Sequence, residues 1–137
     1  MTSGSTSATS EYTVIVARES DAPDARFLMV RHRERGWELP GGKLEGREGP
    51  VRCALREFKE ETGHLLDDPR FVLKLQKENG TCFVFTGTLG VRVGVVEEED
   101  VIEEMDWFDR LPEPLAFPDD PYDEMGEALG LTFGRNG

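Results

Sequence analysis

The sequence predicts a single-domain α/β sandwich built around a mixed β-sheet. Two observations favour this fold class: strand-forming runs rich in Val, Ile and Phe occur in pairs, and two helical segments lie between and after the pairs. The 137 residues suit one domain of ordinary size. We assign residues 1–10, rich in Ser and Thr, to a disordered tail and residues 11–137 to the folded domain.

Four runs are predicted to form two β-hairpins. Residues 12–18 and 26–31 are apolar runs separated by a short Asp/Ala/Pro turn, which is typical of adjacent strands. Residues 71–78 and 81–89 are joined by Asn79-Gly80, the dipeptide that best tolerates the positive φ angles of a tight hairpin turn. We therefore expect one hairpin before the first helix and one after it.

Two helices and one further strand complete the expected elements. The first helix spans residues 49–62 and ends at Gly63, and its apolar residues recur at helical spacing. A short strand is expected over 104–108, and a closing helix over 121–129 has proline in its first turn. The apolar positions that define the first helix are Val51, Ala54, Leu55, Phe58 and Thr62.

The charge balance excludes several classes of partner. Sixteen Lys and Arg against 28 Asp and Glu give a net charge of −12, which disfavours binding to nucleic acid polymers and to anionic membranes. No run approaches the ~18 apolar residues of a membrane span, and the first residues do not resemble a signal peptide. Cys53 and Cys82 match no metal-binding spacing, so we interpret them as buried thiols of a cytoplasmic protein.

Three carboxylates share one side of the first predicted helix. At about 100° per residue, Glu57, Glu60 and Glu61 fall on one arc beside the apolar face. Like charges at this spacing repel, and a hard divalent ion such as Mg²⁺ or Mn²⁺ removes the repulsion. The alternative is a solvated acidic face, which is common in a chain with this many acidic residues.

A glycine-rich segment precedes this helix and distinguishes the two interpretations. Residues 39–45 contain Gly41 and Gly42, which we expect to form a sharp turn with close backbone approach to an anion or a metal. Such a turn, placed in fixed register before an acidic helix, favours a metal and phosphate site over a solvated surface.

The register of glycine and charged residues resembles the signature box of the Nudix hydrolases. The box reads Gly42, five residues, Glu48, seven residues, Arg56-Glu57-Phe58, one residue, Glu60-Glu61, one residue and Gly63. Every charged and glycine position matches, and the single departure is His64, where the family usually has an aliphatic residue. The resemblance implies a Nudix-type α/β/α sandwich over residues 11–137.

The resemblance also implies an activity, namely Mg²⁺-dependent pyrophosphohydrolysis of a nucleoside diphosphate linked to another group. Carried over by position, Glu57, Glu60 and Glu61 bind the metal, and the Gly41 carbonyl completes its shell. Arg56 orients Glu57, and Glu48 braces the loop and helix. A metal in this place neutralises phosphate charge and activates water for in-line attack.

The general base has two candidates. Glu60 is the first choice within the box. The acidic run over residues 97–100, followed by Glu103 and Glu104, offers a distal base or ligand, for which Glu98 is the representative. The alternative for this run is a solvated acidic loop.

Substrate contacts are expected outside the helix. Phe117-Pro118-Asp119-Asp120 resembles the Trp-Pro-Asp-Asp stretch of Nudix enzymes that hydrolyse oxidised purine nucleoside triphosphates. There Phe117 would stack on the base, and Asp119 and Asp120 would read its edge if one carboxyl is protonated. The same residues also suit a turn in which Asp120 caps the next helix. Further candidate contacts are Gly42, Lys43 and Arg33, the last flanked by Arg31 and Arg35 in a phosphate-attracting patch.

The favoured function is therefore hydrolysis of a nucleoside triphosphate such as 8-oxo-dGTP to the monophosphate and pyrophosphate. The rival substrates are ADP-ribose and dinucleoside polyphosphates. A hypothesis of another class is a non-catalytic nucleotide-sensing Nudix module. We expect a small-molecule nucleotide as the partner, and a monomer or a homodimer as the assembly.

Overall fold

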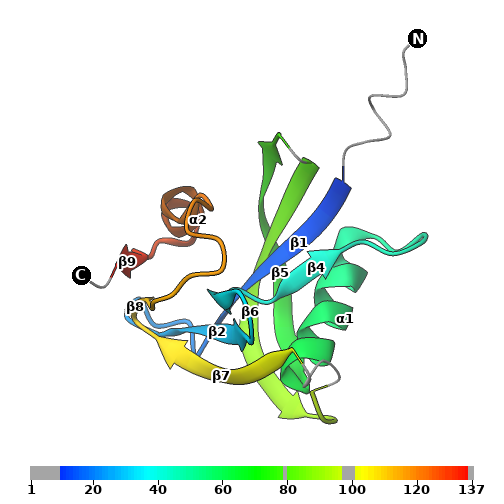
Figure 1. The fold of residues 1–137 in the computed structure, drawn as a ribbon, viewed down its shortest axis with the longest axis horizontal. Helices are drawn as coiled ribbons and strands as arrows, with labels where there is room; N and C mark the ends of the chain where they lie inside the picture. The colour runs from blue at the N-terminus through cyan, green and yellow to red at the C-terminus, as the bar shows by residue number, and fades with distance from the viewer. Residues whose placement is uncertain (1–9, 79, 97–100, 136–137) are drawn as a thin grey trace.

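The computed structural model describes residues 10–78, 80–96 and 101–135 (Figure 1). The predicted tail lies outside the described residues except for Ser10, with which the first strand begins. Within the described part, no helix is long and apolar enough to span a bilayer. The elements there are β1 (Ser10–Arg18), β2 (Phe27–His32), β3 (Gly36–Glu38), β4 (Gly41–Lys43), α1 (Pro50–Thr62), β5 (His64–Lys77), β6 (Gly80–Arg92), β7 (Ile102–Phe108), β8 (Arg110–Leu111), α2 (Tyr122–Leu129) and β9 (Gly134–Arg135).

Seven strands form one mixed sheet. The hydrogen-bonded order is β3-β2-β1-β6-β5, with β4 paired to β1 and β7 paired to β2, while β8 and β9 form a separate pair. The β1–β6 pair is parallel over its whole length, and the other pairs of the large sheet are antiparallel. This mixed sheet confirms the predicted fold class.

The two helices lie on opposite faces of the sheet (Figure 1). Side chains alternate along a strand, so β1 serves both layers. Ile15 and Ala17 pack in the cluster that contains Phe58 of α1, whereas Val16 packs in the cluster that contains Met125 of α2. The result is an α/β/α sandwich with one apolar layer on each side of the sheet.

The first predicted hairpin is wrong beyond its turn. Within the described part, β1 and β2 pair only where Arg18 lies opposite Phe27. β1 instead runs beside β6 and β4, and β2 runs beside β3 and β7. The reason is that β1 lies at the middle of the sheet, where its backbone groups are paired by strands distant in the sequence.

The second predicted hairpin is present and longer than predicted. β5 starts at His64, directly after α1, and pairs antiparallel with β6 from Lys77 opposite Gly80 back to its first residue. Register shifts along β5 allow the ladder to continue through a segment that includes Asp68 with φ 50°. Asn79, the predicted turn residue, lies outside the described residues.

The helix α1 ends where predicted, at Thr62, and begins one residue later than predicted, because Gly49 is its N-cap. Pro50 is its first residue, and Gly63 ends it in the left-handed conformation with φ 75°. The predicted apolar face is partly wrong, because Val51 and Leu55 are exposed. The face that meets the sheet is rotated toward Cys53, Ala54, Phe58, Glu61 and Thr62, all of which are buried.

Candidate active site

Two glycines bring the strand β4 against both β1 and α1. The predicted sharp turn over 39–45 is wrong in this part, because residues 41–43 are extended and pair with Tyr12–Val14 of β1. A Cβ on Gly41 would lie 2.0 Å from the carbonyl oxygen of Thr13, and one on Gly42 would lie 1.9 Å from Oε2 of Glu57. Close approach is thus the reason for glycine here, as predicted, but the partners are a strand and a carboxylate.

Glu61 is the most buried of the three carboxylates, with 8% of the residue exposed. Its Oε1 accepts a hydrogen bond from the backbone N–H of Gly41 at 3.0 Å. A buried carboxylate needs such partners, because an uncompensated one is costly. This contact fixes the end of α1 to β4 and points a carboxylate at the glycine backbone.

Arg56 gathers the other acidic residues of the helix and its loop. Its Nε and Nη2 donate to the two carboxylate oxygens of Glu48 at 3.0 and 2.6 Å. Its Nη1 lies 3.2 Å from Oε1 of Glu60 and 3.6 Å from Oε2 of Glu57. One guanidinium therefore offsets the repulsion among these carboxylates and holds them together.

The Arg56–Glu48 pair fixes the loop before the helix. Glu48 Oε1 also accepts from the N–H of Glu45 at 3.0 Å, and Nη2 of Arg56 donates to the carbonyl of Lys43 at 3.1 Å. The hydrogen bonds from Arg56 lower the pKa of Glu48 to about 2, and the same contact raises the pKa of Arg56. The predicted bracing role of Glu48 is consistent with these contacts.

Cys53 packs beneath the glycine strand. Its Sγ lies 3.4 Å from the carbonyl oxygen of Gly42 and 3.4 Å from Oγ1 of Thr13. Burial raises the pKa of this thiol to about 11, so it is a neutral packing group. Both cysteines are free and buried, as predicted.

The donor set has the chemistry of a site for a hard cation. Glu57 and Glu60, with side chains 12% and 27% exposed, reach the same Arg56 nitrogen, and Glu61 lies one residue on. Among the described residues, no group of three or more His, Cys, Asp or Glu side chains is arranged as a complete metal site. Mg²⁺ commonly takes one or two carboxylates and completes its shell with water and substrate phosphate, so these residues fit it.

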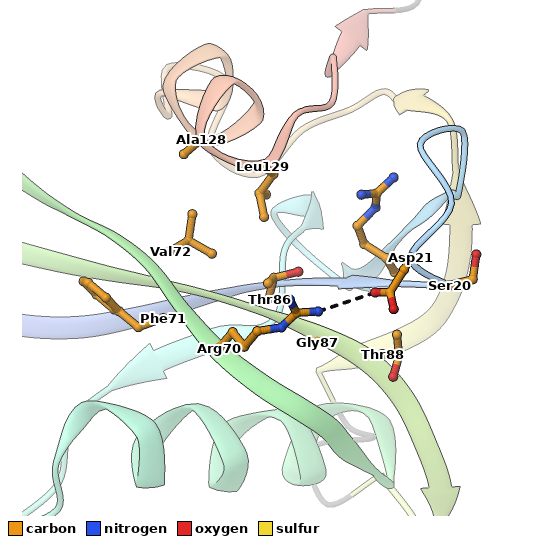
Figure 2. Close-up of a pocket in the computed structure, with 11 residues that line it drawn as sticks. Ser20, Asp21, Arg70, Phe71, Val72, Thr86, Gly87, Thr88, Ala128 and Leu129 are labelled. Atoms are coloured by element: carbon orange, nitrogen blue, oxygen red, sulfur yellow. Dashed lines mark hydrogen bonds and ion pairs between the residues drawn. The ribbon is translucent and has the colours of Figure 1, made fainter.

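A cavity of about 370 Å³ adjoins the C-terminal end of α1, at Glu61. Gly41, Gly42 and Glu61 line it, as do Lys77, Phe117 and Asp120. Glu57 and Glu60 are not among its lining residues. A cavity of about 460 Å³ lies elsewhere, between β5, β6 and α2, where Arg70 pairs with Asp21 at 3.4 Å (Figure 2). None of the three α1 carboxylates lines this cavity, whereas Glu61 and both glycines of β4 line the 370 Å³ cavity, so we place the site there.

The structure brings some of the predicted substrate residues together and leaves others apart. Lys43, Phe117 and Asp120 line the 370 Å³ cavity, and Phe117 is 45% exposed. Asp119 and Arg33 are exposed residues that do not line it. These two side chains therefore do not share the cavity with Glu61 of α1.

Asp120 does not cap the following helix, contrary to one of the two interpretations. The N-cap residue of α2 is Pro121, and it makes no side-chain capping bond. The carboxylate of Asp120 instead accepts from Nζ of Lys77 at 2.8 Å. The turn itself is confirmed, because the N–H of Asp120 donates to the carbonyl of Phe117 at 3.2 Å.

The cavity also holds Arg35, which belongs to the predicted arginine patch, and two charged side chains that sequence reasoning missed, Glu38 and Lys77. Arg35 donates to the buried Glu38 at 2.8 Å, and its guanidinium carbon lies 5.6 Å from the ring centre of Phe117. Burial raises the pKa of Glu38 although Arg35 opposes the shift. Of the three arginines in the predicted patch, Arg35 lines this cavity, whereas no spacing signal points to Glu38 or Lys77.

The candidate distal base Glu98 lies outside the described residues. Glu103 and Glu104 are described and pair with Arg31, at 3.8 and 3.4 Å. Together with Glu61 they line a separate cavity of about 340 Å³.

The fold is an α/β/α sandwich, and its helix α1 carries three carboxylates that suit a hard cation. One of them, Glu61, lines the cavity. The sequence model of the NUDIX domain matches residues 10–121. The chain therefore belongs to the Nudix family, as the signature box predicts. Nudix hydrolases in general use divalent metal ions.

Known proteins share parts of the sequence and most of the fold. The 8-oxo-dGTP diphosphatase of Proteus vulgaris is 40% identical over 50 residues, covering 36% of this chain and 45% of that enzyme. The m7GpppN-mRNA hydrolase of Saccharomyces cerevisiae is 30% identical over 91 residues, covering 62% and 9%. The chain thus matches less than half the length of these relatives.

Among solved structures, an ADP-ribose pyrophosphatase from Streptococcus suis has a TM-score of 0.70 at 19% identity, over 93% of this chain and 98% of that one. The Bacillus subtilis pyrophosphohydrolase BsRppH has a TM-score of 0.69 at 21% identity, over 93% and 85%. At these identities the likeness shows the fold alone.

Proposed function

We propose that this chain is a Mg²⁺-dependent enzyme, with Mn²⁺ as a substitute, that hydrolyses a nucleoside triphosphate such as 8-oxo-dGTP to the monophosphate and pyrophosphate. Membership of the Nudix family supports an enzyme that acts on nucleotide phosphoanhydride bonds. Local similarity to an 8-oxo-dGTP diphosphatase supports the substrate class. We also propose a cytoplasmic location, where free thiols stay reduced.

The observation that carries the proposal is the contact between β4 and the helix carboxylates at the edge of the cavity. Glu61 is tied to the backbone of Gly41, and Glu57 packs on Gly42. The same cavity reaches Phe117 and Asp120. A nucleotide placed there has its phosphates beside the carboxylates and its base beside the aromatic ring.

In this proposal Glu57, Glu60 and Glu61 hold the metal, which when bound neutralises phosphate charge and activates water. Arg56 keeps Glu57 and Glu60 in place, and Glu48 keeps Arg56 in place. Glu60 is the most exposed of the three metal-binding carboxylates, and it accepts a proton from the attacking water. Lys43, next to the glycines, contributes positive charge toward the phosphates.

The substitutions Glu57→Gln and Glu61→Gln test the metal-binding carboxylates. Gln keeps the size of the side chain, and at position 61 it keeps an acceptor for the Gly41 N–H, so the fold should survive. We expect kcat to fall by about two to three orders of magnitude, because each change removes a charged ligand. Glu127→Gln on α2, an exposed change, is the matched control.

A substrate panel measured with Mg²⁺ tests the activity itself. Release of pyrophosphate from 8-oxo-dGTP, dGTP or ATP supports the proposal, and cleavage of ADP-ribose or a dinucleoside polyphosphate alone replaces its substrate class. Nucleotide binding with no turnover of any substrate would instead indicate a sensing module. Near-normal rates in both glutamine variants would remove Glu57 and Glu61 from the mechanism.

A further inference from the structure

Lys77 and Asp120 form an ion pair that lines the cavity, and it places a hydrogen-bond donor beside an acceptor. Nζ of Lys77 lies 2.8 Å from Oδ1 of Asp120, with 29% and 21% of the two side chains exposed. Both residues line the cavity that Gly42 and Glu61 also line. The pair therefore faces the same cavity as Glu61, one of the candidate catalytic carboxylates.

The elements fix this pair from three sides. Lys77 is the last residue of β5, Asp120 belongs to the turn before α2, and the Lys77 ammonium lies 5.9 Å from the ring centre of Tyr12 on β1. Burial lowers the pKa of Lys77, but the hydrogen bond and charge of Asp120 outweigh it, so the net pKa is raised. Lys77 is thus a permanent donor at neutral pH.

The pair keeps hydrogen-bonding capacity for a ligand. An ammonium has three N–H donors, so after the hydrogen bonds to Asp120 and Tyr12 one donor remains on Lys77. A carboxylate has about four acceptor positions, so Asp120 also keeps acceptors. Phe117, half exposed in the same cavity, offers a ring for a base to stack on. A base placed there directs its polar edge toward the Asp120 carboxylate, which accepts, and the Lys77 ammonium, which donates.

We propose that Lys77 is a specificity-determining residue, which with Asp120 selects guanine-type bases over adenine; this rests on the proposed nucleotide hydrolysis. Lys77 donates to the O6 carbonyl, and the carboxylate of Asp120 accepts from N1–H and the 2-amino group. Adenine in the same placement sets its amino N–H against the ammonium and its bare N1 against the carboxylate. This pairing needs no protonated carboxyl, unlike the two-aspartate scheme that the sequence suggested.

The base preference is measured as the ratio of kcat/KM for GTP to that for ATP, with Mg²⁺ present. We expect a ratio of about ten or more, because a mismatched edge leaves buried polar groups unpaired. ITP keeps O6 and N1–H but lacks the amino group, so it should fall between the two. Equal rates for GTP and ATP would overturn the inference while leaving the proposed hydrolysis intact.

Variants at two lysines of β5 test the role of Lys77. Lys77→Met removes the donor but keeps much of the side-chain length, and the ratio should fall at least about fivefold. Lys77→Arg keeps a cation and should retain most of the preference. Lys74→Met, an exposed change on the same strand, is the control and should leave the ratio unchanged. A ratio that survives Lys77→Met in a folded variant would remove Lys77 from recognition.

Equilibrium binding separates this inference from the proposed activity. Calorimetry with GDP and ADP reports the base preference without turnover. Tighter binding of GDP that is lost in Lys77→Met supports the inference even if no triphosphate is hydrolysed. Equal affinity for GDP and ADP contradicts it whatever the enzyme hydrolyses.

Discussion

Gly41 and Gly42 are adjacent residues whose missing side chains serve different ends. The space beside Gly41 is filled by the backbone of β1, which cannot move without breaking strand pairing. The space beside Gly42 is filled by the carboxylate of Glu57, which can move by rotating. Gly41 is therefore needed for the pairing of β4 with β1, and Gly42 is needed for the position of the Glu57 carboxylate.

Alanine at each glycine should separate these effects. Gly41→Ala should reduce the free energy of unfolding by about 2 kcal/mol or more, because overpacking against backbone is costly. Gly42→Ala should cost less stability but lower kcat by about tenfold or more, because Glu57 is displaced. Urea denaturation and pyrophosphate release measure the two quantities. Equal losses of stability in the two variants would contradict the distinction.

The loop and helix around α1 act as one element because Arg56 joins them. The guanidinium bonds Glu48 in the loop and Glu60 on the helix, so the loop is attached to the helix by charge as well as by chain. The pair is only partly exposed, with Glu48 largely covered. Its strength should therefore depend on the ionisation of Glu48.

The stability of this element should fall in acid. The pKa of Glu48 is about 2 in the folded protein and near its usual 4.5 in the unfolded chain. The contribution of the pair is then complete above the unfolded pKa and is lost as the pH falls through the folded pKa. The difference in unfolding free energy between the native protein and Glu48→Gln should shrink between those two values.

Glu45→Gln serves as the control for this experiment. Glu45 lies 3.6 Å from the same guanidinium, but its side chain is 71% exposed. Solvent weakens such a pair, so its contribution should be small at every pH. A difference between the native protein and Glu48→Gln that does not change with pH would show that the Arg56–Glu48 bond does not depend on ionisation.

At the scale of the whole molecule, the net charge of −12 acts against the compact state. Salt screens repulsion between surface carboxylates, so the melting temperature should rise between about 0.05 and 0.5 M NaCl. Exposed ion pairs such as Arg26–Glu19 are screened as well, but they contribute little. A melting temperature that falls with salt would mean that attractive pairs outweigh the net repulsion.

The parts of the molecule that sequence predicts well are those encoded by local spacing. Helix boundaries follow from Pro50 and Gly63, and the box places Glu48, Arg56 and the helix carboxylates in one register. The parts that the sequence does not predict depend on contacts between segments far apart in the chain. Lys77 meets Asp120 only because β5 ends beside the turn before α2, and no local pattern encodes that meeting.

The same limit explains the errors in the sheet. The apolar run of β1 predicts a strand but not its neighbours, so a local hairpin was the simplest expectation. Gly-Gly usually marks a turn, so the sequence predicts a turn where the structure has the extended strand β4. Only the close packing of β4 on Thr13 and Glu57 makes those glycines part of a strand.

The parallel pairing of β1 with β6 sets a constraint on biosynthesis. The hydroxyl of Thr86 donates to the carbonyl of Val16 across 70 positions, so β1 leaves the ribosome well before the strand with which it pairs. Such long-range pairing slows folding, and it leaves both apolar faces of β1 uncovered on the nascent chain. The order in which the strands are translated is thus not the order in which the sheet assembles.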